Sequence, residues 1–163
     1  MTKPMLAEID HTPTSATRVL GILTPLLGFR MRRIHNHLTR SFSERLGDQA
    51  LRPGGFSALG LMAANPGMSQ KMLSDELGQD KATVVALLDE LERRGWAERR
   101  RDVADRRRHH LFITPAGEES LAWMAKEAVA NERGVVAALT DDEARTLLSL
   151  LDKVYRGAFP TDP

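Results

Sequence analysis

Cysteine is absent from the 163 residues, and aromatic residues make up only 5% of them. Without cysteine the chain can form no disulfide, thiolate nucleophile, sulfur-ligated zinc site or thiol redox sensor. No apolar run approaches the roughly 20 residues that a bilayer-spanning helix needs. The composition, 42% hydrophobic and 28% charged, is that of an ordinary globular protein. We therefore expect one compact domain in the cytoplasm, without a membrane partner.

The first 16 residues have neither the apolar stretch nor the cleavage pattern of a signal peptide. We expect residues 1–16 to form a flexible N-terminal arm. The rest of the chain shows no internal repeat and no low-complexity segment.

Positive charge is concentrated in two short segments, although the net charge is only +1. Residues 29–53 hold six arginines against two acids, and residues 93–110 hold eight arginines against three acids. The segments 54–92 and 111–163 are both acidic. Clustered arginines favour phosphate contacts, so this distribution indicates nucleic acid as a partner.

Helical spacing of apolar residues predicts the first two elements. One long amphipathic helix is expected over residues 17–46, and a short helix from Pro53 to about Ala64. The segment Asn65-Pro66-Gly67 is expected to end the second helix.

Two further helices are expected on either side of the tight connection at residues 78–80. Ser69 is placed to cap the first of them and Asp80 the second, which Gly95 ends. This pattern predicts a helix-turn-helix, in which the first turn of the second helix lies against base edges in the DNA major groove. The side chains at that position are Lys81, Ala82 and Thr83.

The segments 95–102 and 108–115 predict two short strands that pair as a hairpin. A helix-turn-helix followed by a hairpin is a winged helix, and an arginine at the hairpin tip can enter the narrow minor groove. A solvated, charged hairpin is the alternative interpretation. Alternation along the first strand predicts that Arg100 faces away from its neighbours, so we do not expect every arginine of the hairpin to contact phosphate.

Two C-terminal helices complete the prediction, the first capped by Thr114 and the second by a capping box at residues 140–143. Their apolar faces exceed what a small winged module can cover, so we expect them to be buried in a homodimer. The expected fold is mainly α with a small β-hairpin wing. A winged helix-turn-helix at 53–114 would lie between dimerisation helices at 17–52 and 115–159.

The string "NPGMSQKMLSDELGQDKATVVALLDELERRGWAERRRDVADRRRHHLFITPAG", residues 65–117, resembles the MarR family of winged-helix transcriptional regulators, and the likeness extends from about residue 20 to 158. The resemblance implies a homodimer that reads an inverted repeat in double-stranded DNA. It also implies a repressor that a small, often aromatic or acidic, ligand releases from the DNA.

The resemblance also implies roles for single residues. Asp105 would orient the wing, and Ala104 stands where many members have arginine, which leaves open which arginine enters the minor groove. Arg52 and Gly55 replace a threonine cap and a glutamine that are frequent in the family. The residues assigned to DNA binding are Ser69, Gln70, Lys71, Lys81, Ala82, Thr83, Arg106, Arg107 and Arg108.

A second basic feature is a stripe at helical spacing formed by Arg30, Arg33, His37 and Arg40. A solvated face is one interpretation. The other is a site for an anionic ligand, such as an aromatic carboxylate or a phosphate-bearing thioester, because in this family the effector binds between the first helix and the winged domain. The candidate ligand-binding residues are Phe29, Arg30, Arg33, His37, Phe56 and Met62.

Catalytic and metal-binding patterns are lacking. The sequence shows no Ser-His-Asp order, no glycine-rich phosphate loop and no supported carboxylate pair, so we predict neither an enzyme nor a cofactor. His109 and His110 are adjacent on a predicted strand and should point to opposite faces, which argues against a shared metal ion. A winged-helix interaction or assembly module without operator specificity is the alternative function.

Overall fold

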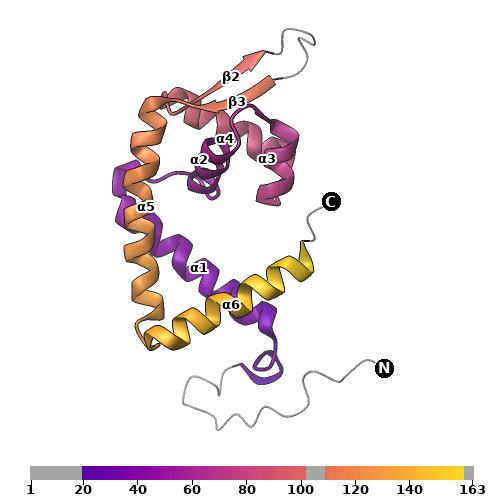
Figure 1. Ribbon diagram of the computed structural model, residues 1–163, viewed down its shortest axis with the longest axis vertical. Coiled ribbons are helices and arrows are strands. Elements are labelled where there is room, and N and C mark those ends of the chain that lie inside the picture. The colour runs from indigo at the N-terminus through magenta and orange to yellow at the C-terminus, as the bar shows by residue number, and fades with distance from the viewer. Residues whose placement is uncertain (1–19, 102–108, 160–163) are drawn as a thin grey trace. The chain divides into compact units, whose positions relative to one another are not determined.

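The computed structural model of the chain describes residues 20–101 and 109–159 and is mainly helical, with a small antiparallel sheet (Figure 1). The chain divides between Arg40 and Ser41 into two compact units. The boundary lies within helix α1, Leu27–Leu46. None of the described helices is long and apolar enough to cross a membrane.

In the first unit, a 3-10 turn at Gly21–Leu23 precedes α1. The predicted helix over residues 17–46 is wrong in its first part, because the described chain becomes α-helical only at Leu27. Pro25 explains the difference, since it has no amide donor and therefore cannot lie in the interior of a continuous α-helix. Within α1 the guanidinium of Arg32 stacks over Phe29, 5.5 Å from the ring centroid.

The second unit contains the end of α1, the remaining helices and the sheet. Its elements are the 3-10 helix Gly47–Gln49, α2 Gly55–Ala64, β1 Met68–Ser69, α3 Gln70–Leu77, α4 Lys81–Arg93, β2 Ala97–Arg101, β3 His109–Ile113, α5 Pro115–Val136 and α6 Asp141–Ala158. The predicted fold class is confirmed.

Local capping explains where these helices begin and end. The Ser69 hydroxyl accepts a hydrogen bond from the Met72 amide at 3.1 Å, and Gly78 ends α3 with φ +60°. The predicted capping box at the start of α6 is also confirmed. Helix α2 begins at Gly55 rather than at Pro53, because the left-handed Gly54, with φ +91°, turns the chain immediately before it.

The sheet has the strand order β1-β3-β2, and both pairings are antiparallel. The predicted pairing of β2 with β3 is confirmed, and in the structure Arg99 lies opposite Leu111 and Arg101 opposite His109. The strand β1 was not predicted, because only two residues form it and a tertiary contact with β3 defines it. This contact places the start of α3 beside the wing.

The hydrophobic core lies between α2, α3, α4 and the sheet. The inward face of α4 includes Val84, Leu88 and Leu91, which have no exposed surface. Leu59 and Leu111 are equally buried, and they contribute to the same cluster from α2 and β3.

Thr114 joins the wing to α5. Its hydroxyl donates to the Gly95 carbonyl at 2.6 Å and accepts from the Gly117 amide at 3.1 Å, while its own amide donates to the Trp96 carbonyl at 3.0 Å. The approach is so close that a Cβ atom on Gly117 would lie 2.0 Å from the Trp96 carbonyl oxygen. The beginning of α5 is therefore fixed against the end of α4.

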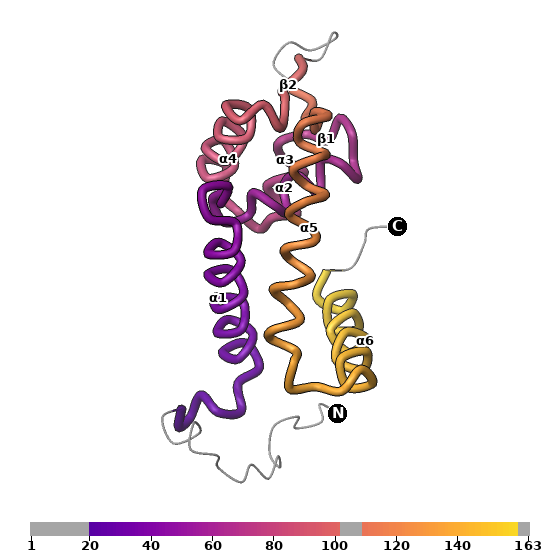
Figure 2. The backbone as a smooth tube through the Cα atoms, turned by 90° about the vertical axis from the view of Figure 1, so that its left-hand side faces the viewer, coloured from indigo at the N-terminus to yellow at the C-terminus, as the bar shows by residue number. Residues whose placement is uncertain are grey.

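Helix α5 extends away from the sheet, and α6 turns back from its far end (Figure 2). The large apolar side chains of α6 are exposed, including Leu148 at 65% and Val154 at 50%. Tyr155 packs on Phe159 with ring centroids 4.8 Å apart. A row of exposed apolar side chains along one helix is typical of an interaction surface.

Candidate nucleic-acid interface

Helix α4, the second helix of the helix-turn-helix and here called the recognition helix, begins at a capped and exposed first turn. One carboxylate oxygen of Asp80 accepts hydrogen bonds from the Ala82 and Thr83 amides at 2.9 and 3.0 Å, and the other accepts from the Thr83 hydroxyl at 2.6 Å. Lys81, Ala82 and Thr83 are all exposed. The cap therefore fixes the backbone of the residues that were predicted to reach the bases.

Hydrogen bonds to its ionised form change the acidity of Asp80. The Thr83 hydroxyl, followed by the Thr83 amide, holds the pKa of Asp80 below its ordinary value of 3.8. Asp80 therefore stays ionised at neutral pH, and its charge is directed at the amides of the first turn, where the helix dipole is positive.

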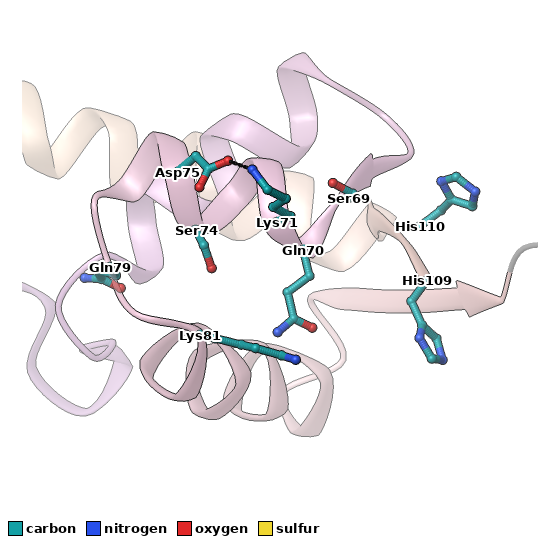
Figure 3. Close-up of a pocket in the computed structure, with 9 residues that line it drawn as sticks. All are labelled: Ser69, Gln70, Lys71, Ser74, Asp75, Gln79, Lys81, His109 and His110. Carbon is teal, nitrogen blue, oxygen red and sulfur yellow. Dashed lines mark hydrogen bonds and ion pairs between the residues drawn. The ribbon is translucent and has the colours of Figure 1, made fainter. Parts of the chain in front are cut away.

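A hollow of about 860 Å³ lies between α3, the start of α4 and β3 (Figure 3). In Figure 3 the side chains of Gln70, Lys81 and His109 extend into the same space, whereas His110 points away from it. The residues that line the hollow are Ser69, Gln70, Lys71, Ser74, Asp75, Gln79, Lys81, His109 and His110.

Charge in the hollow is partly compensated. The Lys71 ammonium lies 2.6 Å from a carboxylate oxygen of Asp75, four residues along α3. Both side chains are more than half exposed, so this pair is weak and can exchange one partner for another. Lys81 comes from a different helix and extends toward Gln70 (Figure 3). The hollow therefore presents polar and cationic groups from two helices on one surface.

The structure brings together four of the predicted DNA-binding residues, because Ser69, Gln70, Lys71 and Lys81 all line the hollow. Ala82 and Thr83 lie beside it on the first turn of α4. The remaining predicted residues, Asp105, Arg106, Arg107 and Arg108, lie outside the described residues.

The first arginine of the wing has a role that the sequence did not indicate. Nη1 of Arg99 lies 2.7 Å from Oδ1 of Asp89 and 2.5 Å from Oε2 of Glu92. The backbone amide of Arg99 also donates to Oε1 of Glu92 at 2.9 Å. Its side chain is only 19% exposed. Arg99 therefore connects β2 to the recognition helix, and its charge is matched by two carboxylates of that helix.

Arg100 behaves differently from Arg99, as strand alternation predicted. It forms an ion pair with Glu98, and its guanidinium stacks over Phe112, 4.3 Å from the ring centroid. Phe112 is the cross-strand partner of Glu98, so these three side chains share one face of the hairpin. The prediction that Arg100 points to the opposite face from Arg99 is confirmed.

The two histidines of β3 separate in the same way. His110 donates a hydrogen bond from Nδ1 to the Gly67 carbonyl at 2.8 Å, which secures the loop before β1. His109 lines the hollow and was missed as a candidate, because the sequence gives no sign of the β1–β3 contact that brings α3 beside it. Among the described residues, no group of three histidine or acidic side chains could hold a metal ion.

The proposed ligand-binding residues lie in both units. In the first unit, Phe29 and Arg30 are half-buried, while Arg33 and His37 are exposed. In the second, Phe56 packs against Phe42 edge to face, with centroids 5.4 Å apart. Met62, also in the second unit, has no exposed surface and belongs to the core.

A helix-turn-helix with an exposed first turn on its second helix, followed by an antiparallel hairpin, defines a winged helix-turn-helix DNA-binding protein. A model of the MarR family matches residues 54–108. A Thauera aromatica protein assigned to regulation of the hcr operon is 32% identical over 152 residues, which cover 93% of this chain and 86% of that protein. The chain belongs to the MarR family of transcriptional regulators.

Solved structures support the same conclusion. The transcriptional repressor CouR, bound to a 23-mer DNA duplex, is 35% identical, with a TM-score of 0.74 over 84% of this chain and 97% of that chain. A MarR-family regulator from Rhodococcus sp. RHA1 is 25% identical, with a TM-score of 0.76 over 86% of this chain and 98% of its own. The protein is thus a DNA-binding transcription regulator and not an enzyme, as the sequence predicted.

The Asp80 cap predicts a specific acid dependence of stability. Because its pKa is lower in the folded protein, the ionised carboxylate stabilises the fold fully above pH 3.8, and this stabilisation is lost as the pH falls through the lower folded value. Thr83→Val removes the hydroxyl that contributes most, so the pKa of Asp80 should move back toward 3.8. An NMR titration of the Asp80 carboxyl in both proteins measures this. A pKa at or above 3.8 in the wild type would contradict the prediction.

Proposed function

We propose that the protein is a homodimeric repressor that binds an inverted-repeat operator and is released from it by a small anionic ligand. The observation that carries the proposal is the exposed first turn of α4 beside the hollow, where Lys81 stands next to polar side chains of α3. The relative CouR, described as a repressor and solved on a DNA duplex, supports it. We assign its site of action to the cytoplasm because its partner is DNA.

In the proposed complex, the two helices have different tasks. Lys81, Ala82 and Thr83 face base edges in the major groove, where side chains distinguish the four base pairs. Ser69, Gln70 and Lys71 at the start of α3 contact backbone phosphates, which set the register of the protein on the duplex. His109 adds a further donor to the same surface.

The wing supplies the second part of the proposed interface. Strands β2 and β3 lead to and from residues 102–108, and the Arg99 contacts fix the base of β2 on α4. We propose that Arg106, Arg107 and Arg108 contact phosphates and the minor groove, with Asp105 orienting them. These contacts are independent of base sequence, apart from the groove width that they sense.

Operator specificity is tested by selecting duplexes from a random DNA pool with the wild-type protein. The selected inverted repeat should bind about a thousandfold more tightly than a scrambled duplex of the same composition. Lys81→Ala should weaken binding to the selected duplex by about tenfold and relax its preference, because a base contact contributes about 1–3 kcal/mol of discrimination. Arg107→Ala should instead weaken binding to both duplexes and lower the salt slope by about one.

Lys126→Ala is the matched control, because it removes the same charge from an exposed position on α5. Gel-shift titrations at several salt concentrations compare the four proteins. Equal losses for Lys81→Ala and Lys126→Ala would contradict the assignment of Lys81. A wild-type preference near one would favour the alternative function, a winged-helix interaction module without operator specificity.

The proposed homodimer rests on the apolar face of α6. Leucines at 147, 148 and 151 lie on one side of the helix with Val154 and Tyr155, and all of them are exposed. A second copy related by a two-fold axis would cover this face and place two recognition helices about 34 Å apart, one turn of DNA. The proposed dimerisation region comprises residues 17–52 and 115–159, on either side of the proposed DNA-binding module at 53–114.

Leu148→Glu is expected to convert the proposed dimer to monomer at micromolar concentration, because it buries a charge in an apolar interface. Ser149→Glu adds the same charge to the opposite, polar side of α6 and should leave the dimer intact. Sedimentation velocity measures both. A wild-type protein that sediments as a monomer, or equal effects of the two variants, would be inconsistent with this interface.

The proposed ligand site is centred on Arg33 and His37, which are exposed on α1 four residues apart. Aromatic acids and their coenzyme A thioesters are the probes. A ligand at 100 times its dissociation constant should add about 2.7 kcal/mol to the unfolding free energy of the wild type. Arg33→Ala should reduce the thermal shift, and Arg156→Ala, an exposed arginine of α6, should retain it. If no probe stabilises the wild type, the stripe is a solvated face.

A further inference from the structure

The guanidinium of Arg94 connects the C-terminal end of the recognition helix to the segment that precedes α2. Arg94, the C-cap residue immediately after α4, donates to the Gln49 and Ala50 carbonyls at 3.3 and 2.8 Å. It also donates to Glu90 at 3.1 Å, one turn back along α4. Its guanidinium lies 5.0 Å from the centroid of the Trp96 ring, so four groups share one side chain.

Glu90, the partner of Arg94 within α4, is unusually buried for an acidic residue. The Glu90 side chain is only 9% exposed, and its second oxygen lies 3.3 Å from Nε of Arg52. A buried carboxylate is costly unless cations compensate it, so the geometry of Arg94 and Arg52 around Glu90 is constrained. Arg52, like Gln49 and Ala50, precedes α2. The end of α4 is thus bonded to the chain that connects α1 with α2.

The same connecting segment, residues 49–54, also reaches the other end of α4. Nε2 of Gln79, in the turn before the helix, donates to the Pro53 carbonyl at 3.3 Å. The Gln79 side chain lies so close to Gly54 that a Cβ atom built on Gly54 would be 2.8 Å from Nε2 of Gln79. Extended, six residues span about 20 Å, and the 13 residues of α4 rise about 20 Å, so one segment can contact both ends.

These polar contacts restrain the tilt of α4, which the apolar core alone does not fix. Burial of Val84, Leu88 and Leu91 fixes which face of α4 is inward, but apolar contact has no preferred direction and permits small tilts. Hydrogen bonds to two successive carbonyls are directional. A tilt of about 5° at one end of a helix of this length moves the other end by roughly 2 Å, which is enough to break a base contact.

We propose that Arg94 is a positioning residue for DNA recognition: its contacts with the connecting segment set the direction in which the first turn of α4 faces the operator. The proposal rests on the proposed function. According to this proposal, the end of α4 that is remote from Lys81 controls how the first turn reads the bases. It also makes the connecting segment the route by which a displacement at the end of α1 reaches the recognition helix.

The test compares two adjacent arginines. Arg94→Met keeps an unbranched apolar stem of similar size to that of arginine and removes the guanidinium, while Arg93→Met removes the same charge from a neighbouring exposed position. The probes are the duplex selected with the wild-type protein and its scrambled counterpart, and the readout is the ratio of the two affinities. Circular dichroism and titration with scrambled DNA at low salt give the folded and active fractions.

Arg94→Met is expected to lower the affinity ratio by about tenfold, the equivalent of one lost base contact, while binding to scrambled DNA stays equal to that of Arg93→Met. The ratio for Arg93→Met should stay within about twofold of the wild type. Arg94→Lys keeps the charge but cannot form the forked contacts, so its ratio should fall between the two.

An unchanged ratio in Arg94→Met, or an equal fall in both methionine variants, would overturn the proposal. If Arg94→Met does not fold, Arg94→Lys decides, and a wild-type ratio in it would overturn the proposal. Loss of folding in both Arg94 variants would also overturn it, since the guanidinium would then hold the fold rather than the helix direction. A wild-type protein that prefers no sequence contradicts instead the proposed function.

Discussion

Burial of one face of α4 decides which of its side chains can meet DNA. Val84, Leu88 and Leu91 are in the core, so the opposite face and the first turn are all that the helix can offer to a partner. The sheet and α3 pack around the same core, and their placement beside the first turn of α4 follows from it. The geometry of the interface is thus a consequence of apolar packing, with polar contacts refining it.

The acidic residues of α4 are all used within the protein. Asp80 caps the first turn, Asp89 and Glu92 bind Arg99, and Glu90 binds Arg94. An acidic helix would otherwise repel phosphate, but here each carboxylate is directed at an amide or a guanidinium. Two of the arginines that look available for DNA are therefore occupied in neutralising the recognition helix. The basic character of the surface depends on the remaining ones.

Much of this arrangement could be predicted from local chemistry. The side chains of Ser69, Asp80 and Thr114 each accept a capping hydrogen bond from an amide two or three residues further on, so their positions in the sequence identify the helix starts. The role of Arg99 could not be predicted, because its partners are set by how β2 lies on α4 rather than by spacing. The same holds for His109, whose place in the hollow depends on a strand of two residues.

The bonding around Thr114 has a consequence for how the protein opens. One residue ties the carbonyls of Gly95 and Trp96 to the amide of Gly117, so the end of α4 and the start of α5 share one hydrogen-bond network. In hydrogen exchange the amides of this junction would behave as one cooperative unit. We therefore expect a displacement of the long α5 to be transmitted through Thr114 to the end of the recognition helix.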